Sequence, residues 1–171
     1  RSGFNSLKEA FEDQAKHIFA IETGLSSNPE MNWRLSQLDE IALMSNSDSH
    51  SPHPWRLGRE ANVFEFEAEK VSFENIFDAV RNQDASHFKY TLEVDPNYGK
   101  YHYDGHRVCN FSCPPSETRK LKGICPVCKR ALVIGVLNRV EELADRPVGF
   151  ERKKRIPFKS ILPLHELLAA A

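Results

Sequence analysis

Four cysteines, all that the chain contains, lie within residues 109–128 and constrain the fold more than any other feature. Cys109 and Cys113 form a C-x3-C pair, and Cys125 and Cys128 form a C-x2-C pair after an interval of eleven residues. Each pair fits on one tight turn, so the two turns can present four sulfur atoms to one tetrahedral zinc ion. A disulfide framework or four buried thiols would use the same residues. Zinc is favoured because the two close pairs leave no cysteine over.

One alternative for the fourth zinc ligand lies just before the first cysteine. His102 and His106 precede Cys109, and the C-x3-C pair is looser than a usual zinc turn. His106 could therefore take the place of Cys113.

Length and composition bound the remaining possibilities. A chain of 171 residues forms one or two domains, and 40% hydrophobic with 27% charged residues is ordinary for a soluble globular protein. No apolar run approaches the length of a membrane span, and the N-terminus does not read as a signal peptide. Cysteines in metal-ligand spacing fit a reducing compartment, so we expect a cytoplasmic protein. The start at Arg1 leads us to expect a piece of a longer protein.

Charge is distributed unevenly along the chain. Residues 1–80 hold seven Lys/Arg against fourteen Asp/Glu, whereas residues 86–130 hold eight Lys/Arg against four Asp/Glu. This asymmetry indicates a metal-holding part joined to an anion-binding part. Two solvated surfaces with a chance asymmetry would give the same counts.

The first half alternates short apolar runs with a capped helix. Residues 17–22 and 41–44 read as buried strands, and between them Asn28 caps a helix that begins at Pro29 and runs to about Asp39. This order is typical of a parallel α/β sheet or barrel. The predicted fold is α/β, a partial βα barrel over residues 1–82, followed by a small α+β zinc-binding domain over residues 86–171.

Other elements follow from local patterns. We expect strands at residues 63–66, 87–94 and 132–136, and helices at residues 6–16, 72–81 and 138–144. A final apolar helix from about Pro163 is expected to dock on the core.

Polar residues follow the two predicted strands of the first half. Glu22 ends the first strand, and Asp48 and His50 follow the second. On extended backbone, residues two apart point the same way, and a carboxylate and an imidazole together make a half-site for a divalent metal. By itself the pattern is more typical of an Asp-Ser turn beside a histidine, but its position after a buried strand shifts the balance toward the metal half-site.

Candidate nucleic-acid contacts lie in two loops and in one basic run. The loop after His50 combines arginines with a tryptophan, a pairing that can meet phosphate and stack on a base, although the same loop could simply pack on its own barrel. The basic run at residues 152–155 reads as a solvated loop or a phosphate contact. The candidate contact residues in the loops are Trp55, Arg56, Arg59, Lys120, Lys122 and Arg130.

Several of these stretches resemble a known family over nearly the whole chain. Residues 21–27 (IETGLSS), 45–50 (SNSDSH) and 57–60 (LGRE) resemble the end of a PHP (polymerase and histidinol phosphatase) domain. The zinc-binding part that follows this domain in the endonuclease Q family is resembled by residues 99–102 (GKYH), 104–107 (DGHR), 125–128 (CPVC) and 139–146 (RVEELADR).

The resemblance implies a distorted βα barrel holding divalent metals (Zn²⁺, Mn²⁺ or Mg²⁺), joined to a structural zinc domain. It also implies an endonuclease that nicks DNA beside deaminated bases or abasic sites, after turning the damaged base out of the stack. Asp48 and His50 match the last metal-ligand motif of PHP domains, and Glu22 matches an acidic position near the site. The earlier ligand motifs have no counterpart here. We therefore expect the C-terminal part of such an enzyme, inactive by itself.

Two rival functions use the same residues. One is a non-catalytic zinc module that binds nucleic acid or protein, and the other is a PHP phosphoesterase acting on a small molecule. The basic zinc half argues against a small substrate, which would not need it. An incomplete barrel would leave apolar strands unpaired, so we expect either a homodimer, with Phe4, Phe11 and Phe19 at the contact, or a loosely ordered first half.

Overall fold

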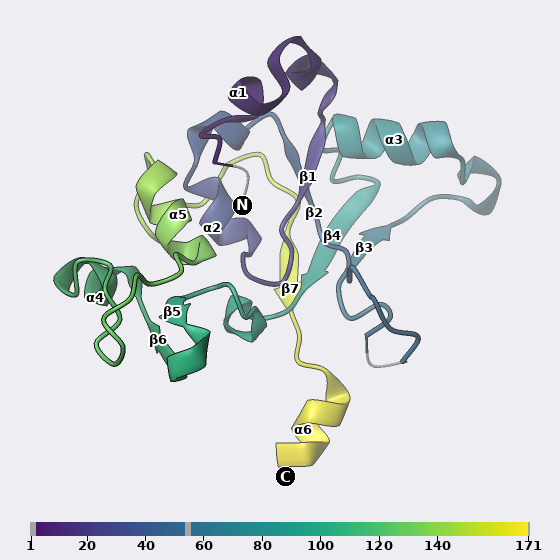
Figure 1. The fold of residues 1–171 in the computed structure, drawn as a ribbon. Coiled ribbons are helices and arrows are strands. Elements are labelled where there is room, and N and C mark those ends of the chain that lie inside the picture. The colour runs from purple at the N-terminus through teal and green to yellow at the C-terminus, as the bar shows by residue number, and fades with distance from the viewer. Residues whose placement is uncertain (1–2, 54–55, 171) are drawn as a thin grey trace.

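The computed structural model describes residues 3–53 and 56–170 as a mixed α/β fold (Figure 1). The strands are β1 (Ala20–Glu22), β2 (Ala42–Met44), β3 (Ala61–Phe64), β4 (Phe88–Glu93), β5 (Asp104–His106), β6 (Phe111–Cys113) and β7 (Phe158–Ser160). The α-helices are α1 (Leu7–Phe11), α2 (Pro29–Trp33), α3 (Phe73–Arg81), α4 (Pro115–Lys120), α5 (Val136–Leu143) and α6 (Leu164–Ala170). Short 3₁₀ turns occupy Glu12–His17, Ser36–Leu38, Ala68–Lys70, Pro96–Tyr98 and Arg107–Cys109.

The predicted strand, helix and strand of the first half are present. β1 and β2 pair in parallel with Ala20 opposite Ala42, and the helix between them begins where Asn28 accepts a hydrogen bond from the Met31 amide at 3.0 Å. α2 ends at Trp33, earlier than predicted, because Leu35 takes an extended conformation. Parallel pairing brings the ends of β1 and β2 to one edge, where the candidate site lies.

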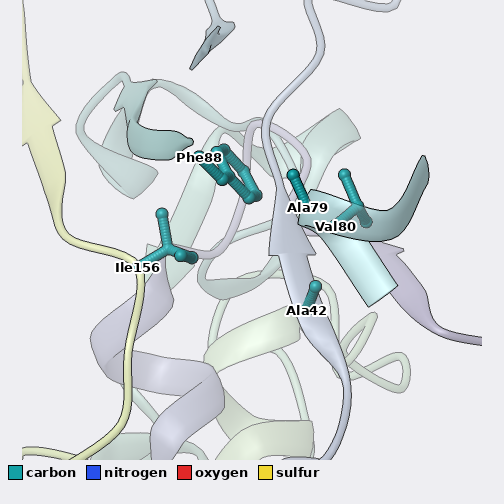
Figure 2. Packing of buried hydrophobic residues seen from close by; sticks show 5 residues of the cluster. All are labelled: Ala42, Ala79, Val80, Phe88 and Ile156. Carbon is teal, nitrogen blue, oxygen red and sulfur yellow. The ribbon is translucent and has the colours of Figure 1, made fainter. Parts of the chain in front are cut away.

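A second sheet crosses the position predicted for a domain boundary. β4 pairs antiparallel with β3 and parallel with β7, so strands from both sides of residues 82–86 share one sheet. Figure 2 shows the core that they build, with Phe88 fully buried among side chains from β2, α3 and the segment before β7. Its buried residues are Ala42, Ala79, Val80, Phe88 and Ile156. The two predicted domains therefore share a hydrophobic core.

The four cysteines lie on a separate unit at one end of the fold. β5 and β6 form an antiparallel hairpin with His106 opposite Phe111, and α4 follows it directly. In Figure 1 this unit lies at the opposite end of the molecule from α3. Cys113, Cys125 and Leu132 form its small buried cluster.

Several local predictions need correction. The helix predicted for residues 6–16 ends at Phe11, because Glu12 has a φ of +49°, and it continues as a 3₁₀ turn. The strand predicted at 132–136 is reduced to one isolated bridge, Gly105 with Val133, and Val136 already begins α5. The leucines of α6 do not dock, because Leu164 and Leu168 are each 69% exposed.

The basic run at residues 152–155 is only partly a surface feature. Arg152 is buried and donates hydrogen bonds to the Leu38 carbonyl at 3.1 Å and to the Gln83 side chain. Burial lowers the pKa of this guanidinium, but its carbonyl and amide partners replace the lost water. Arg152 therefore joins chain segments and is not free to contact phosphate. Among the described helices, none has the length and apolar character needed to cross a bilayer.

Candidate metal and nucleic-acid site

Four side chains converge in the hairpin unit. Ligand atoms of His106, Cys109, Cys125 and Cys128 all lie within 4.8 Å of one another. The His106 Nδ1 atom is 3.0 Å from the Cys109 sulfur and 3.3 Å from the Cys128 sulfur. Three sulfur atoms and one imidazole nitrogen are a donor set that zinc binds tetrahedrally in structural sites. This group could therefore hold a metal ion.

Cys113 lies outside this group, contrary to the set of four cysteines that spacing alone favours. It ends β6 as a buried residue, and its sulfur is 3.3 Å from the Thr118 hydroxyl. His106 ends the facing strand, β5, and its Nδ1 atom lies close to the Cys109 sulfur. The alternative with His106 in place of Cys113 is the one that the geometry fits.

The second cysteine turn stabilises thiolate at its first residue. Burial raises the pKa of Cys125, but hydrogen bonds from the backbone amides of Cys128 and Val127 outweigh it, so the pKa of Cys125 is lowered. Hydrogen bonding to Cys128, with burial, raises the pKa of Cys109 to about 11. Gly123, just before this turn, has a φ of +72°, which glycine adopts without strain. Because metal ligation needs thiolate, the amide donors of this turn suit a metal-binding role.

A buried carboxylate behind the cluster holds the unit to the rest of the chain. Asp104 is fully buried and accepts hydrogen bonds from the Thr118 hydroxyl at 2.5 Å, the Gly135 amide at 2.6 Å and the Asn138 side chain. These partners belong to α4 and to the start of α5. Asp104 was not among the predicted site residues, although its place two residues before His106 in a short strand could have indicated a support for that ligand.

The candidate barrel residues line one pocket at the ends of β1 and β2. Glu22, Asp48, His50, Arg56 and Arg59 all border this pocket of about 380 Å³. Asp48 and His50 are 78% and 84% exposed, and the His50 Nδ1 atom lies 2.7 Å from the Asp48 carbonyl oxygen. Because Nδ1 faces that carbonyl, the Nε2 atom of His50 is the ring nitrogen left for binding a ligand.

The prediction that Asp48 and His50 lie on extended backbone was wrong. Asp48 has a φ of +43°, so the backbone between them turns and is not extended. The turn, with its carbonyl contact to His50, resembles the alternative of an Asp-Ser turn beside a histidine. The two readings are compatible, because the turn leaves both side chains on the pocket wall.

Two buried carboxylates behind this pocket were missed. Glu60 is buried and takes hydrogen bonds from the Arg59 Nε atom at 2.9 and 3.1 Å. Glu93 is buried on β4 and accepts from the hydroxyls of Thr23 at 2.9 Å and Thr91 at 2.8 Å. Burial raises the pKa of both carboxyls. Glu60 lies just before β3 and Glu93 ends β4, and the local sequence gave no signal of their burial, which depends on the packed structure.

The predicted phosphate contacts differ in their surroundings. Arg56 is exposed at the pocket, whereas Arg59 is held by Glu60. On the hairpin unit, Lys122 and Arg130 are exposed, and the exposed Lys120 pairs with Glu117 at 3.0 Å. The prediction for Trp55 lies outside the described residues.

The chain is similar to proteins of known sequence and structure over almost its whole length. MJ0043 of Methanocaldococcus jannaschii is 34% identical over 169 residues, which are 97% of this chain and 21% of that protein. YqxK of Bacillus subtilis is 32% identical over 143 residues, which are 83% of this chain and 34% of that protein. No protein-family model matches.

Solved structures of a lesion-specific endonuclease share the fold. The crystal structure of PfuEndoQ from Pyrococcus furiosus matches 98% of this chain and 40% of its own, with a TM-score of 0.81 and 36% identity. Endonuclease Q, in complex with a 27-mer duplex substrate with an abasic lesion at the active site, matches 98% of this chain and 41% of its own, with a TM-score of 0.82 and 35% identity. The resemblance to the endonuclease Q family predicted from the sequence is confirmed. The chain spans well under half the length of each of these proteins.

Proposed function

We propose that this chain is a DNA-binding, metal-holding part of a lesion-specific endonuclease, and that it acts with further barrel elements that it does not contain. The observation that carries the proposal is the single pocket shared by Glu22, Asp48, His50 and Arg56, on a fold that matches endonuclease Q over 98% of the chain. The sheet pairs of this half would then form part of a PHP-type barrel. Deaminated bases and abasic sites are the proposed lesions.

The pocket side chains suit a divalent metal and a phosphate together. The Asp48 carboxylate, the His50 Nε2 atom and the Glu22 carboxylate would hold metal ions, which when bound polarise a phosphodiester and make water more acidic. Arg56 faces the same pocket and would pair with a phosphate oxygen. Three ligands are an incomplete set for a pair of ions, so the remaining ligands would come from outside this chain.

The hairpin unit would serve as a structural zinc module that also contacts DNA. His106, Cys109, Cys125 and Cys128 would bind zinc, because three thiolates and an imidazole favour that ion over magnesium or calcium. Lys120 ends α4, and Lys122 and Arg130 lie on either side of the turn that holds Cys125 and Cys128. These three cations would pair with phosphates.

Salt dependence of DNA binding tests the proposal. The chain should bind an abasic-site duplex with an affinity that falls steeply with salt, and Lys120→Glu with Lys122→Glu should reduce the salt slope by about two, or one for each lost phosphate contact. Glu117→Gln in α4 is the matched control that removes no cation. Salt-independent binding, or no binding in dilute buffer, would instead favour a protein-binding zinc module.

The proposed homodimer has weaker support. β1 pairs only with β2 among the described strands, and Phe4 and Phe11 are exposed. Phe19, however, packs edge-on against Phe77, with the Arg81 guanidinium 4.5 Å from its ring centre. Light scattering across a dilution series tests the dimer, and a monomer at micromolar concentration would contradict it.

A further inference from the structure

We propose that Tyr101 is a stacking platform for a nucleobase beside the pocket of Asp48 and His50. This inference rests on the proposed function and names a residue that the sequence patterns did not assign to the site. The inference is based on the rigid backbone at Tyr101, the exposure of its ring and the chemistry of the pocket that it lines.

One side of the Tyr101 segment is packed tightly against the loop that follows β1. A Cβ atom built on Gly99 would lie 2.1 Å from the Ser26 hydroxyl and 2.7 Å from the Leu25 carbonyl oxygen, so only glycine permits this approach. The Nδ1 atom of the buried His102 lies 2.9 Å from the Ser26 carbonyl oxygen. Contacts on both sides of Tyr101 thus attach it to the loop that borders the pocket.

The opposite side is held by the start of α5. The Tyr101 carbonyl accepts a hydrogen bond from the Val136 amide at 2.7 Å, and the His102 carbonyl accepts one from Leu137 at 3.0 Å. A Cβ atom on Gly135 would lie 2.4 Å from backbone atoms of Tyr103. The backbone at Tyr101 is therefore fixed from two directions.

The Tyr101 side chain remains free despite this rigid support. The residue is 71% exposed, and within residues 3–53 and 56–170 its side chain makes no recorded hydrogen bond or ring contact. A tyrosine on a fixed backbone loses little conformational freedom when it binds a ligand, because only two side-chain torsions need to be ordered. The ring adds little to folding and is well suited to stacking.

Tyr101 lines two pockets of different character. One is the polar pocket with the carboxylates of Glu22 and Asp48, the imidazole of His50 and the guanidinium of Arg56. The other is a pocket of about 890 Å³ formed largely by apolar residues near the start of α5. Metal ligands, a phosphate partner and an aromatic face are the groups that complement the parts of one nucleotide.

Two decamers of equal charge separate base stacking from phosphate binding. One is deoxythymidine decamer and the other is a decamer of abasic tetrahydrofuran nucleotides, each labelled for fluorescence anisotropy and measured without added divalent metal. Tyr101→Ala should weaken binding of the thymidine decamer by about fivefold or more and leave the abasic decamer unchanged. Tyr101→Phe should bind both like the unaltered chain. Phe73→Ala removes a similarly exposed aromatic residue from α3 and is the control.

The outcomes distinguish this inference from the proposed function. If the unaltered chain binds both decamers with steep salt dependence and Tyr101→Ala changes neither, the stacking role is wrong and the DNA-binding function stands. An equal loss for both decamers also overturns stacking, because it indicates a general disturbance. If the unaltered chain binds neither decamer, the stacking role is wrong, and the DNA-binding function is then judged by the measurement on the abasic-site duplex.

Discussion

The guanidinium of Arg146 donates two parallel hydrogen bonds to the carboxylate of Asp39, of 2.8 Å to Oδ1 and 2.5 Å to Oδ2. This pair joins the segment after α2 to the segment after α5, more than a hundred residues along the chain. Hydrogen bonding to Arg146 lowers the pKa of Asp39 despite some desolvation. Since the Ser36 amide also donates a hydrogen bond of 2.9 Å to the Asp145 carboxylate at the same junction, the two halves are bound together by polar contacts as well as by the core.

Removal of this ion pair should destabilise the chain in a pH-dependent way. Arg146→Ala should lower the free energy of unfolding by about 1 kcal/mol at pH 7, because the pair is bidentate yet partly exposed. A lowered carboxyl pKa contributes stability above its ordinary value of 3.8 and loses it as the pH falls below that value. Urea unfolding at pH 7 and pH 3 should therefore show the difference shrinking in acid. Lys120→Ala removes an exposed pair and should change little at either pH.

The identity of the fourth metal ligand can be decided by metal analysis of matched variants. His106→Ala and Cys128→Ser should each lose zinc and melt at a lower temperature, because an open tetrahedral site binds weakly. Cys113→Ser should retain one zinc per chain, since its sulfur contacts Thr118 instead of the cluster. Loss of zinc from Cys113→Ser, with retention in His106→Ala, would restore the set of four cysteines.

Zinc removal should loosen the hairpin unit more than the shared core. In small zinc modules the free energy of zinc binding is largely free energy of folding, on the order of 10 kcal/mol. After chelation, amide hydrogen exchange should rise over residues 104–133, where the buried cluster is built mainly from cysteines. Residues of β4 should stay protected, because Phe88 packs in a core that contains no metal ligand. Equal loss of protection in both regions would show that zinc supports the entire fold.

The buried Glu93 should make stability fall as the pH rises. Burial raises the pKa of Glu93, so the folded state holds the proton more tightly, and stability declines as the pH rises from the ordinary value of 4.5 through the raised value. Glu93→Gln should weaken this pH dependence. Its free energy of unfolding should therefore rise relative to that of the unaltered chain as the pH increases. Glu30→Gln, on the exposed side of α2, is the matched control. An unchanged profile in Glu93→Gln would assign the dependence to other groups.

The chain alone should not cut DNA. Glu22, Asp48 and His50 would supply only part of the proposed metal site, and both Asp48 and His50 are strongly exposed. Incubation with manganese and uracil-containing or abasic DNA should give no nicked product on a denaturing gel. Nicking that disappears in Asp48→Ala would contradict this expectation, whereas nicking that survives it would indicate contamination.

Local sequence was sufficient wherever one residue type determines a local conformation. Ser72 accepts a hydrogen bond from the Asn75 amide at 3.2 Å and starts α3 as predicted, and Asn28 starts α2 in the same way. The apolar runs around Ala20 and Ala42 form parallel strands as predicted, although only β2 is largely buried and β1 is half-buried. The C-x2-C spacing placed Cys125 and Cys128 together for the same reason, since this close pair is confined to one turn.

Only the tertiary structure decided which residues those local elements bring together. His106 and not Cys113 joins the metal group because the pairing of β5 with β6 directs them differently. Arg152 is buried, and β4 pairs with β7 from a distant part of the chain, so the expected boundary lies within a shared core. Such contacts depend on the summed burial of segments far apart in sequence, which no local pattern records. The sequence by itself indicated which kinds of site to expect, and the tertiary packing decided which residues come together in each.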